Sequence, residues 1–189
     1  MMVISPAKTL DFESDSSMFN HTNGEFLGDA QKLIKEIKSL TKSDIANLMK
    51  LSDNLASINV DRYKSWNLPF TKNNSKQAIF AFKGDVYTGL ETETLNKTQI
   101  NFAQKHLRIL SGLYGLMRPL DLMQPYRLEM GTKFQNSRGR NLYEFWGEQL
   151  TTSLNTALAS EKKPLLVNLA SNEYFKAVKT KQINAPIIT

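Results

Sequence analysis

Residues 106–131, HLRILSGLYGLMRPLDLMQPYRLEMG, decide how this chain folds. The stretch opens with an apolar run at 106–110 that predicts a short strand. It then breaks at 111–115, where Gly112 and Gly115 allow a tight turn. Pro119 and Pro125 each disfavour helix for the residue before them, so the next part is predicted to be an extended connection. The run at 126–130 predicts a second short strand.

This central stretch is also rich in positive charge. Between Lys105 and Arg140 there are seven Lys or Arg and two acids, with Tyr114 and Tyr126 among them. Loops at strand ends that carry guanidinium groups are common sites for anions in α/β proteins. We therefore expect a site for an anionic ligand here.

Length and composition restrict the class of protein. The chain has 189 residues, of which 41% are hydrophobic, and this is enough for one domain with its own core. Cysteine is absent, which excludes disulfides and thiolate zinc sites and favours a reducing compartment. The sequence has no long apolar span and no signal-like N-terminus, so we expect a cytoplasmic protein with no membrane partner.

The net charge of +6 is unevenly distributed. Residues 1–30 hold one Lys and five acids, so the remainder carries +10. This asymmetry favours a polyanionic partner, and ordinary solvated lysines on helix surfaces are the alternative explanation.

Strand and helix patterns alternate along most of the chain. Apolar runs predict strands at 1–5, 77–82, 165–169 and 183–189, and helical spacing predicts helices at 29–40, 45–55, 94–104, 142–158 and 174–178. Residues 61–74 are predicted to be an aromatic connection. Ser43 or Asp44 is a candidate cap for the second helix, and Ser171 for the last. The fold class is therefore α/β, a mixed sheet flanked by helices.

The first two predicted helices form a hairpin with a basic corner. Its lysines are candidates for binding DNA phosphates by shape and charge, without reading bases: Lys35, Lys38, Lys42 and Lys50. Most helix hairpins serve only for packing, and this remains the alternative.

Several predicted strand ends carry charged side chains. We expect four cations to lie on one face and form a common basic cleft: Lys8, Lys83, Arg118 and Arg127. In an enzyme, such a cleft would hold an anionic, nucleotide-like substrate, with Glu129 or Asp85 as acid or base and Tyr87 or Tyr114 as positioning groups. A lysine just after a strand is more often only solvated.

Other chemistries are poorly supported by the sequence. His21 and His106 have no ligand spacing around them, so we expect no metal site. Ser111 lacks the GxSxG elbow of serine hydrolases. Gly84 and Gly89 do not match a nucleotide-binding loop, and no cofactor is expected.

Five strings in the sequence resemble the bacterial peroxide stress resistance protein family YaaA, also called UPF0246. They are SPAKTLD (5–11), AFKGDVYTGL (81–90), LSGLYG (110–115), RPLDLMQPYRLEMG (118–131) and NLAS (168–171). The resemblance implies a cytoplasmic protein that resists hydrogen peroxide by keeping free intracellular iron low. It also implies a family-specific α/β fold, a helix-hairpin-helix element placed at 29–55, a basic cleft and binding to DNA, with a preference for distorted duplexes.

Members of this family usually continue for several tens of residues more. We therefore expect residues 1–189 to form a single YaaA-like domain without the family's C-terminal part. Such a domain would leave an incomplete sheet or an exposed apolar patch near Ile187 and Ile188.

Overall fold

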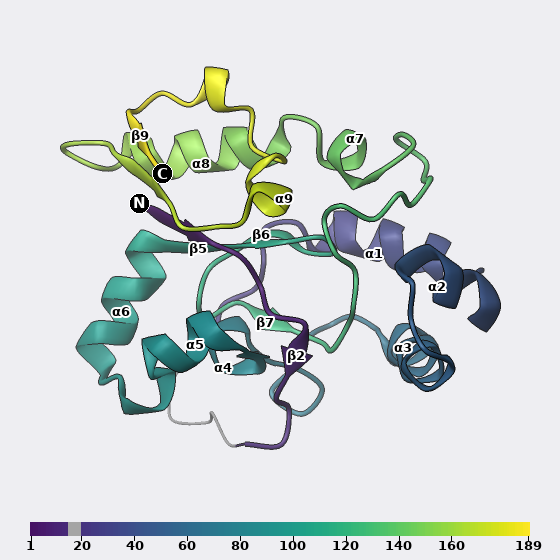
Figure 1. The fold of residues 1–189 in the computed structure, drawn as a ribbon. Helices are drawn as coiled ribbons and strands as arrows, with labels where there is room; N and C mark the ends of the chain where they lie inside the picture. The colour runs from purple at the N-terminus through teal and green to yellow at the C-terminus, as the bar shows by residue number, and fades with distance from the viewer. Residues whose placement is uncertain (15–19) are drawn as a thin grey trace.

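The computed structural model describes residues 1–14 and 20–189, and these form a mixed α/β fold around one central sheet (Figure 1). The five strands lie in the order β6 (Gly115–Met117), β5 (Leu107–Ser111), β1 (Met2–Ile4), β8 (Leu166–Asn168) and β9 (Ile187–Ile188). Pairing is parallel from β5 through β1 and β8 to β9, whereas β6 is antiparallel to β5. The predicted fold class, a mixed sheet flanked by helices, is confirmed.

Helices cover both sides of the sheet. Figure 1 shows α8 (Gln149–Ala159) and α9 (Asn172–Phe175) on one side, with α4 (Ala78–Ala81), α5 (Asp85–Leu90) and α6 (Lys97–His106) on the other. Two short 3-10 helices, Thr92–Thr94 and Thr180–Gln182, join longer elements.

Two small antiparallel ribbons lie outside the main sheet. β2 (Thr9–Leu10) pairs with β4 (Phe82–Lys83), and β3 (Lys76–Gln77) pairs with β7 (Leu122–Met123). The first ribbon joins residues 82–83 to the segment after β1, and the second joins residues 76–77 to the middle of the central stretch.

The central stretch folds around its two glycines. A Cβ on Gly112 would lie 2.1 Å from the Leu128 carbonyl oxygen, and Gly115 has a φ of +71° with Trp146 packed against it. Only glycine fits both positions, which confirms the predicted turn between β5 and β6. Residues 126–130 form no strand in the described chain and end in a turn, so the second predicted strand is wrong.

The N-terminal helices differ from the predicted hairpin. α1 (Leu27–Ile37) buries its predicted face, and α2 (Lys42–Met49) starts with a reciprocal Thr41–Asp44 capping box. The predicted continuation to residue 55 is wrong, because Lys50 turns left-handed at φ 52° and Ser52 caps α3 (Asp53–Ser65). This third helix replaces the first part of the predicted connection at 61–74.

Two other predicted elements are interrupted. The predicted strand at 77–82 contains the single helical turn α4, because the Ala78 and Ile79 amides donate to the carbonyls of Asp121 and Pro119 at 2.9 Å each. The predicted helix at 142–158 is divided into α7 (Leu142–Trp146) and α8, because Gly147 adopts a φ of +51°.

Candidate functional site

The carboxyl ends of β5, β1 and β8 meet at one edge of the sheet. β1 lies in the middle, with β5 on one side and β8 on the other, so the strand order changes direction at β1. In open α/β sheets, ligands bind at this kind of point, in the crevice outside the carboxyl ends of the strands. The segments that follow Ile4, Ser111 and Asn168 are therefore the best-placed parts of the chain for a site.

Ser5 joins three elements at this edge. Its Oγ accepts a hydrogen bond of 2.9 Å from the Ser171 amide and lies 3.3 Å from the Ser171 Oγ. Its carbonyl accepts a bond of 3.1 Å from the Tyr87 hydroxyl, which comes from α5. Burial raises the pKa of Tyr87 well above its usual range, so this phenol remains a neutral donor. Ser171 occupies the predicted N-cap position of α9, but its hydroxyl faces Ser5 and makes no capping bond.

Two cations share one carboxylate beside the serines. Glu129 Oε1 lies 3.6 Å from Lys8 Nζ and 3.2 Å from Arg127 Nη2, and Arg127 Nε also donates to it. The Lys8 side chain is 69% exposed, whereas those of Arg127 and Glu129 are about one-fifth exposed or less. The trio carries a net charge of +1, and Lys8 is its accessible member. We call Ser5, Lys8, Arg127, Glu129 and Ser171 the strand-end site.

Buried hydroxyl groups form hydrogen bonds behind Arg127, one of the residues of this site. Ser111 Oγ and the Tyr126 hydroxyl lie 2.6 Å apart, and the Tyr63 hydroxyl donates to the Arg127 carbonyl. Burial raises the pKa values of Tyr63 and Tyr126, so both stay neutral at physiological pH. They fix the backbone around Arg127 without adding charge.

A further acid lies close to the site. Glu173 Oε1 accepts a bond of 2.9 Å from the Gly131 amide, and the Glu173 carbonyl accepts one of 2.9 Å from the Tyr143 hydroxyl. The first bond holds the start of α9 against the end of the central stretch, and the second holds it against α7.

Lys83 and Asp85 flank the same segment. Lys83 pairs in register with Thr9, the neighbour of Lys8. A Cβ on Gly84 would lie 3.2 Å from the Ala7 Cβ, so the start of α5 abuts the chain between Ser5 and Lys8. Asp85 lies exposed in the first turn of α5.

Arg118 is not brought together with the other three predicted cations. Its Nε and Nη2 donate to the Asp121 carboxylate at 3.1 and 2.9 Å, and Nη2 also donates to the Asn23 carbonyl. It lines a separate hollow of about 400 Å³ together with Arg108 and Glu25. Arg118 was predicted to lie in the cleft because Pro119 follows it. In the structure it comes directly after β6, which runs antiparallel to β5 and so ends at the opposite edge of the sheet.

The four predicted DNA-binding lysines divide into two pairs. Lys38 Nζ donates to the Trp66 carbonyl at 2.9 Å, and Lys42 Nζ pairs with Asp53 at 2.6 Å. Lys35 and Lys50 are exposed, and their side chains make no hydrogen bond or ion pair within residues 1–14 and 20–189. The two free lysines are the better phosphate ligands. In the described chain, α2 packs chiefly against α3.

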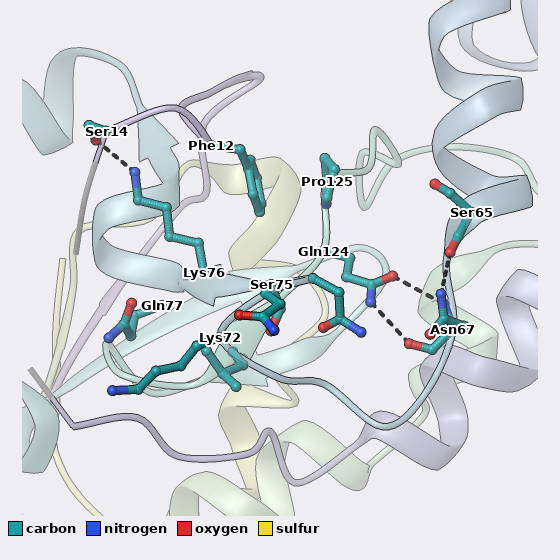
Figure 2. A pocket seen from close by; sticks show the side chains of 13 residues that line it. Phe12, Ser14, Ser65, Asn67, Lys72, Ser75, Lys76, Gln77, Gln124 and Pro125 are labelled. Carbon is teal, nitrogen blue, oxygen red and sulfur yellow. Dashed lines mark hydrogen bonds between the residues drawn. The ribbon is translucent and has the colours of Figure 1, made fainter. Parts of the chain in front are cut away.

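Sequence reasoning missed a polar pocket of about 560 Å³, shown in Figure 2. Phe12 and Pro125 lie along one side of it and Lys72 on the opposite side (Figure 2). Gln124 exchanges two hydrogen bonds with the Asn67 backbone, at 3.1 and 3.0 Å. No local pattern in the sequence signals this pocket, because its walls come from segments that lie far apart in the chain.

Metal-binding clusters and membrane-spanning helices are both absent from the described residues. No group of three or more His, Cys, Asp or Glu side chains in residues 1–14 and 20–189 is arranged to hold a metal ion. In the same part of the chain, no helix has the length and apolarity needed to cross a membrane.

The five strings quoted above converge on the strand-end site. Ser5 contacts Tyr87 and Ser171, Lys8 contacts Glu129, and Ser111 contacts Tyr126, so each contact links two different strings. Residues far apart in sequence therefore form one surface.

Comparisons with known proteins find relatives that match this chain over its whole length. The family model for the peroxide stress protein YaaA matches residues 1–189. A UPF0246 protein from Psychromonas ingrahamii is 59% identical over the whole chain, which covers 74% of that protein. UPF0246 proteins from Shewanella sediminis and Aliivibrio fischeri strain MJ11 are each 54% identical, with 74% and 73% of their lengths covered. The chain belongs to the YaaA family of peroxide stress proteins.

Proposed function

We propose that this chain helps bacterial cells resist hydrogen peroxide by binding DNA through basic surfaces in the cytoplasm and by keeping free iron low. The observation that carries the DNA part is the pairing of Lys8 and Arg127 with the single carboxylate of Glu129. One positive charge is left over, and it lies on an exposed ammonium group at the carboxyl edge of the sheet.

A phosphate oxygen is a suitable partner for this group. Arginine and lysine bind phosphates through charge-assisted hydrogen bonds, and such contacts carry no sequence information. Lys35 and Lys50 would extend the contact to a second surface. We therefore propose binding that is independent of base sequence, and a preference for distorted duplexes remains part of the proposal.

The DNA proposal is tested by fluorescence anisotropy with duplex and bubble DNA over a range of salt concentrations. Each neutralised phosphate adds about 0.9 to the log-log salt slope for duplex DNA. Lys8→Ala with Arg127→Ala should weaken binding to all sequences alike and flatten the slope. Binding that is unchanged in this double variant, or an absence of salt dependence, would contradict a role for the strand-end site.

The iron proposal needs a measurement in cells. Cells that lack the family protein and are supplied with this chain should show less free iron by electron paramagnetic resonance, and should survive peroxide better, than cells with an empty vector. Unchanged free iron together with improved survival would separate protection from iron limitation.

A second function is favoured by the hydroxyl and carboxylate groups at the same edge. The Ser5 and Ser171 hydroxyls lie 3.3 Å apart. Glu129 pairs with Lys8, three residues after Ser5, and Asp85 follows Gly84, which abuts Ala7. An enzyme could hold an anionic, nucleotide-like substrate with Lys8, Lys83 and Arg127, and use Glu129 or Asp85 as acid or base. Tyr87 would act as a positioning residue through Ser5.

Saturation separates the two functions. A small substrate should saturate at one molecule per chain with weak salt dependence, whereas DNA binding should scale with DNA length and weaken steeply with salt. Isothermal titration with nucleoside mono-, di- and triphosphates tests the enzyme function directly. If none of these nucleotides binds, the enzyme function is contradicted and DNA binding is the remaining proposal for the strand-end site.

A further inference from the structure

The polar pocket in Figure 2 is lined by none of the five residues of the strand-end site. Its walls come from the end of α3 and the connection to β3, from the segment after β2, and from the end of β7. The pocket has a volume of about 560 Å³. Pockets for small ligands usually measure about 300–1,000 Å³, so this one has room for a ligand of the size of a nucleotide.

A buried amide group faces this pocket. Gln124 lines it and is 4% exposed. The Gln124 Oε1 accepts from the Asn67 amide and Nε2 donates to the Asn67 carbonyl, which fixes the plane of the side chain. An amide group has two N–H donors and two lone pairs, so one of each has no partner in residues 1–14 and 20–189. Buried polar groups are nearly always hydrogen-bonded, so the free N–H indicates a ligand that carries an acceptor.

The pocket also carries positive charge. Lys72 and Lys76 line it, and no Asp or Glu of the described chain does. Lys76 is 6% exposed, and Asp11 balances its charge at 3.5 Å because a hydrogen bond from the Ser14 amide holds the pKa of Asp11 well below its usual range. Lys72 is exposed and has no ion pair within the described residues. One cation therefore remains for an anionic group of a ligand.

Hydrogen bonds hold the loop that carries Lys72. Asn74 Oδ1 accepts from the Thr71 amide at 2.8 Å, and Asn74 Nδ2 donates to the Pro69 carbonyl at 3.1 Å. The Asn74 amide in turn donates to the Thr71 carbonyl at 3.2 Å. These bonds close a turn around Lys72, so this wall of the pocket is formed before a ligand arrives.

The side of the pocket opposite Lys72 is apolar. Phe12 and Pro125 lie along it, and both are half-buried, so part of each ring is open to the pocket (Figure 2). An aromatic face stacks on any nucleobase, and every nucleobase has a ring nitrogen or a carbonyl that accepts from an amide N–H. A phosphate group suits the lysine on the far side. A sugar phosphate would use the lysine and the amide but would offer no flat face to Phe12.

We propose that this pocket binds a single nucleotide. The base packs against Phe12 and Pro125 and accepts a hydrogen bond from Gln124, and the phosphate pairs with Lys72. The ligand class is a nucleoside 5′-monophosphate, either free or as an unpaired nucleotide of a strand. This site goes beyond the proposed function, which uses the cations of the strand-end site and of the first two helices.

The test is isothermal titration with the four deoxynucleoside 5′-monophosphates and with the corresponding nucleosides. A monophosphate should bind at one molecule per chain and about tenfold or more tightly than its nucleoside, because only the monophosphate makes a charged contact with Lys72. Lys72→Ala should remove this difference and leave the binding of the nucleoside unchanged. Lys64→Ala is the matched control, because Lys64 is an exposed lysine of α3 outside the pocket, and it should keep the difference.

A second pair of variants tests the stacking contact. Phe12→Leu keeps an apolar side chain and loses the aromatic face, so it should weaken monophosphate and nucleoside alike by about fivefold or more. Phe12→Trp should retain binding. Circular dichroism establishes that each variant is folded.

The strand-end variant separates this proposal from the proposed function. Lys8→Ala with Arg127→Ala should leave nucleotide binding unchanged, whatever it does to DNA binding in the anisotropy assay. If no monophosphate binds to the wild-type chain, the proposal is overturned and DNA binding is unaffected by that result. If binding is lost in the strand-end variant and kept in Lys72→Ala and Phe12→Leu, the proposal is also overturned, and the nucleotide belongs to the strand-end site.

Competition identifies the source of the nucleotide. A single-stranded oligonucleotide that displaces the monophosphate from the wild-type chain would show that a nucleotide of a strand enters the pocket. Without displacement, the occupant is a free nucleotide. Either result supports the pocket as a nucleotide site.

Discussion

The Lys8 ammonium group lies 3.6 Å from the Glu129 carboxylate, and it reaches this partner from the connection between β1 and β2. Glu129 belongs to the end of the central stretch, where Arg127 also contacts it. The pair therefore closes the edge of the sheet between two segments that share no strand pairing. Because the acid is shared, it partly screens both cations from an incoming anion.

Removal of this acid should strengthen the binding of anions. Glu129→Gln keeps the shape of the side chain and releases both Lys8 and Arg127, so DNA affinity should rise and the salt slope should steepen by up to about 0.9. Glu93→Gln, at an exposed position in the 3-10 helix after α5, controls for the change in net charge alone. If the two variants behave alike in an anisotropy titration, the local pairing has no role. If Glu129→Gln weakens binding, Glu129 positions the cations instead of competing with the ligand.

The lysines of the first two helices provide a second comparison. Lys35→Ala with Lys50→Ala should weaken binding to all DNA sequences and flatten the salt slope by up to about 1.8, two phosphate contacts' worth. Lys38→Ala with Lys42→Ala is the matched control, since these side chains already bind the Trp66 carbonyl and Asp53. Equal losses of DNA affinity in both double variants would show that the bonds of Lys38 and Lys42 to their present partners do not prevent them from binding phosphate.

A buried hydrogen-bond centre at Tyr114 should contribute strongly to stability. Its hydroxyl accepts from Trp66 Nε1 at 2.9 Å and from the Gln124 amide at 3.0 Å, and it bonds to the Gln124 carbonyl. Tyr114→Phe leaves buried donors without an acceptor, which should cost about 1–3 kcal/mol in the free energy of unfolding by urea. Tyr143→Phe removes one exposed bond to the Glu173 carbonyl and should cost less than about 1 kcal/mol. Similar losses in the two variants would contradict this account.

Two glycines should respond oppositely to replacement by alanine. Gly112→Ala would force a methyl group to within 2.1 Å of the Leu128 carbonyl oxygen, so the backbone must shift and the loss should exceed about 4 kcal/mol. Gly89 lies in α5, where a methyl group added at its Cα would have no atom within 4 Å, so Gly89→Ala should stabilise by about 0.5–1 kcal/mol. Melting temperatures of the two variants give the comparison, and a mild effect at Gly112 would mean that the turn is less tightly held than the geometry indicates.

Local patterns in the sequence were enough to predict four of the five strands of the main sheet, whereas β6 was not predicted as a strand. Short apolar runs ended by Pro6 and by Gly112 predicted β1 and β5 nearly to the residue. Proline and glycine both interrupt regular structure, so they mark where such a strand must end. The run at 77–82 failed because apolar residues in a short buried segment fit a strand or a helical turn equally well. Its conformation is decided by the carbonyls of Pro119 and Asp121, which are about 40 residues away in the chain.

Part of the candidate site was also predictable from local patterns, namely from the predicted ends of strands. Lys8, Arg127 and Glu129 were named because each lies near a predicted strand end, and parallel strands bring such ends together. Arg118 met the same criterion but follows the antiparallel strand β6, whose end lies at the opposite edge. The Ser5–Ser171 contact could not be predicted from either segment alone, because it depends on β8 lying beside β1.

The last prediction concerns alkaline pH and the six tyrosines. Burial is the main cause of a raised pKa at every one of them, compared with about 10 for a free tyrosine: Tyr63, Tyr87, Tyr114, Tyr126, Tyr143 and Tyr174. A phenol whose pKa is raised on folding stabilises the fold fully below pH 10, and this stability is lost as the pH rises above 10 toward the folded pKa.

The native protein should therefore show almost no phenolate absorbance at 295 nm near pH 10, and the absorbance should then rise together with the loss of the circular dichroism signal. Half-buried Tyr143 should be the first to titrate, so Tyr143→Phe should remove any early part of the rise. The chain unfolded in guanidinium chloride should titrate near pH 10, and native protein that did the same with its circular dichroism intact would show that these phenols are open to water.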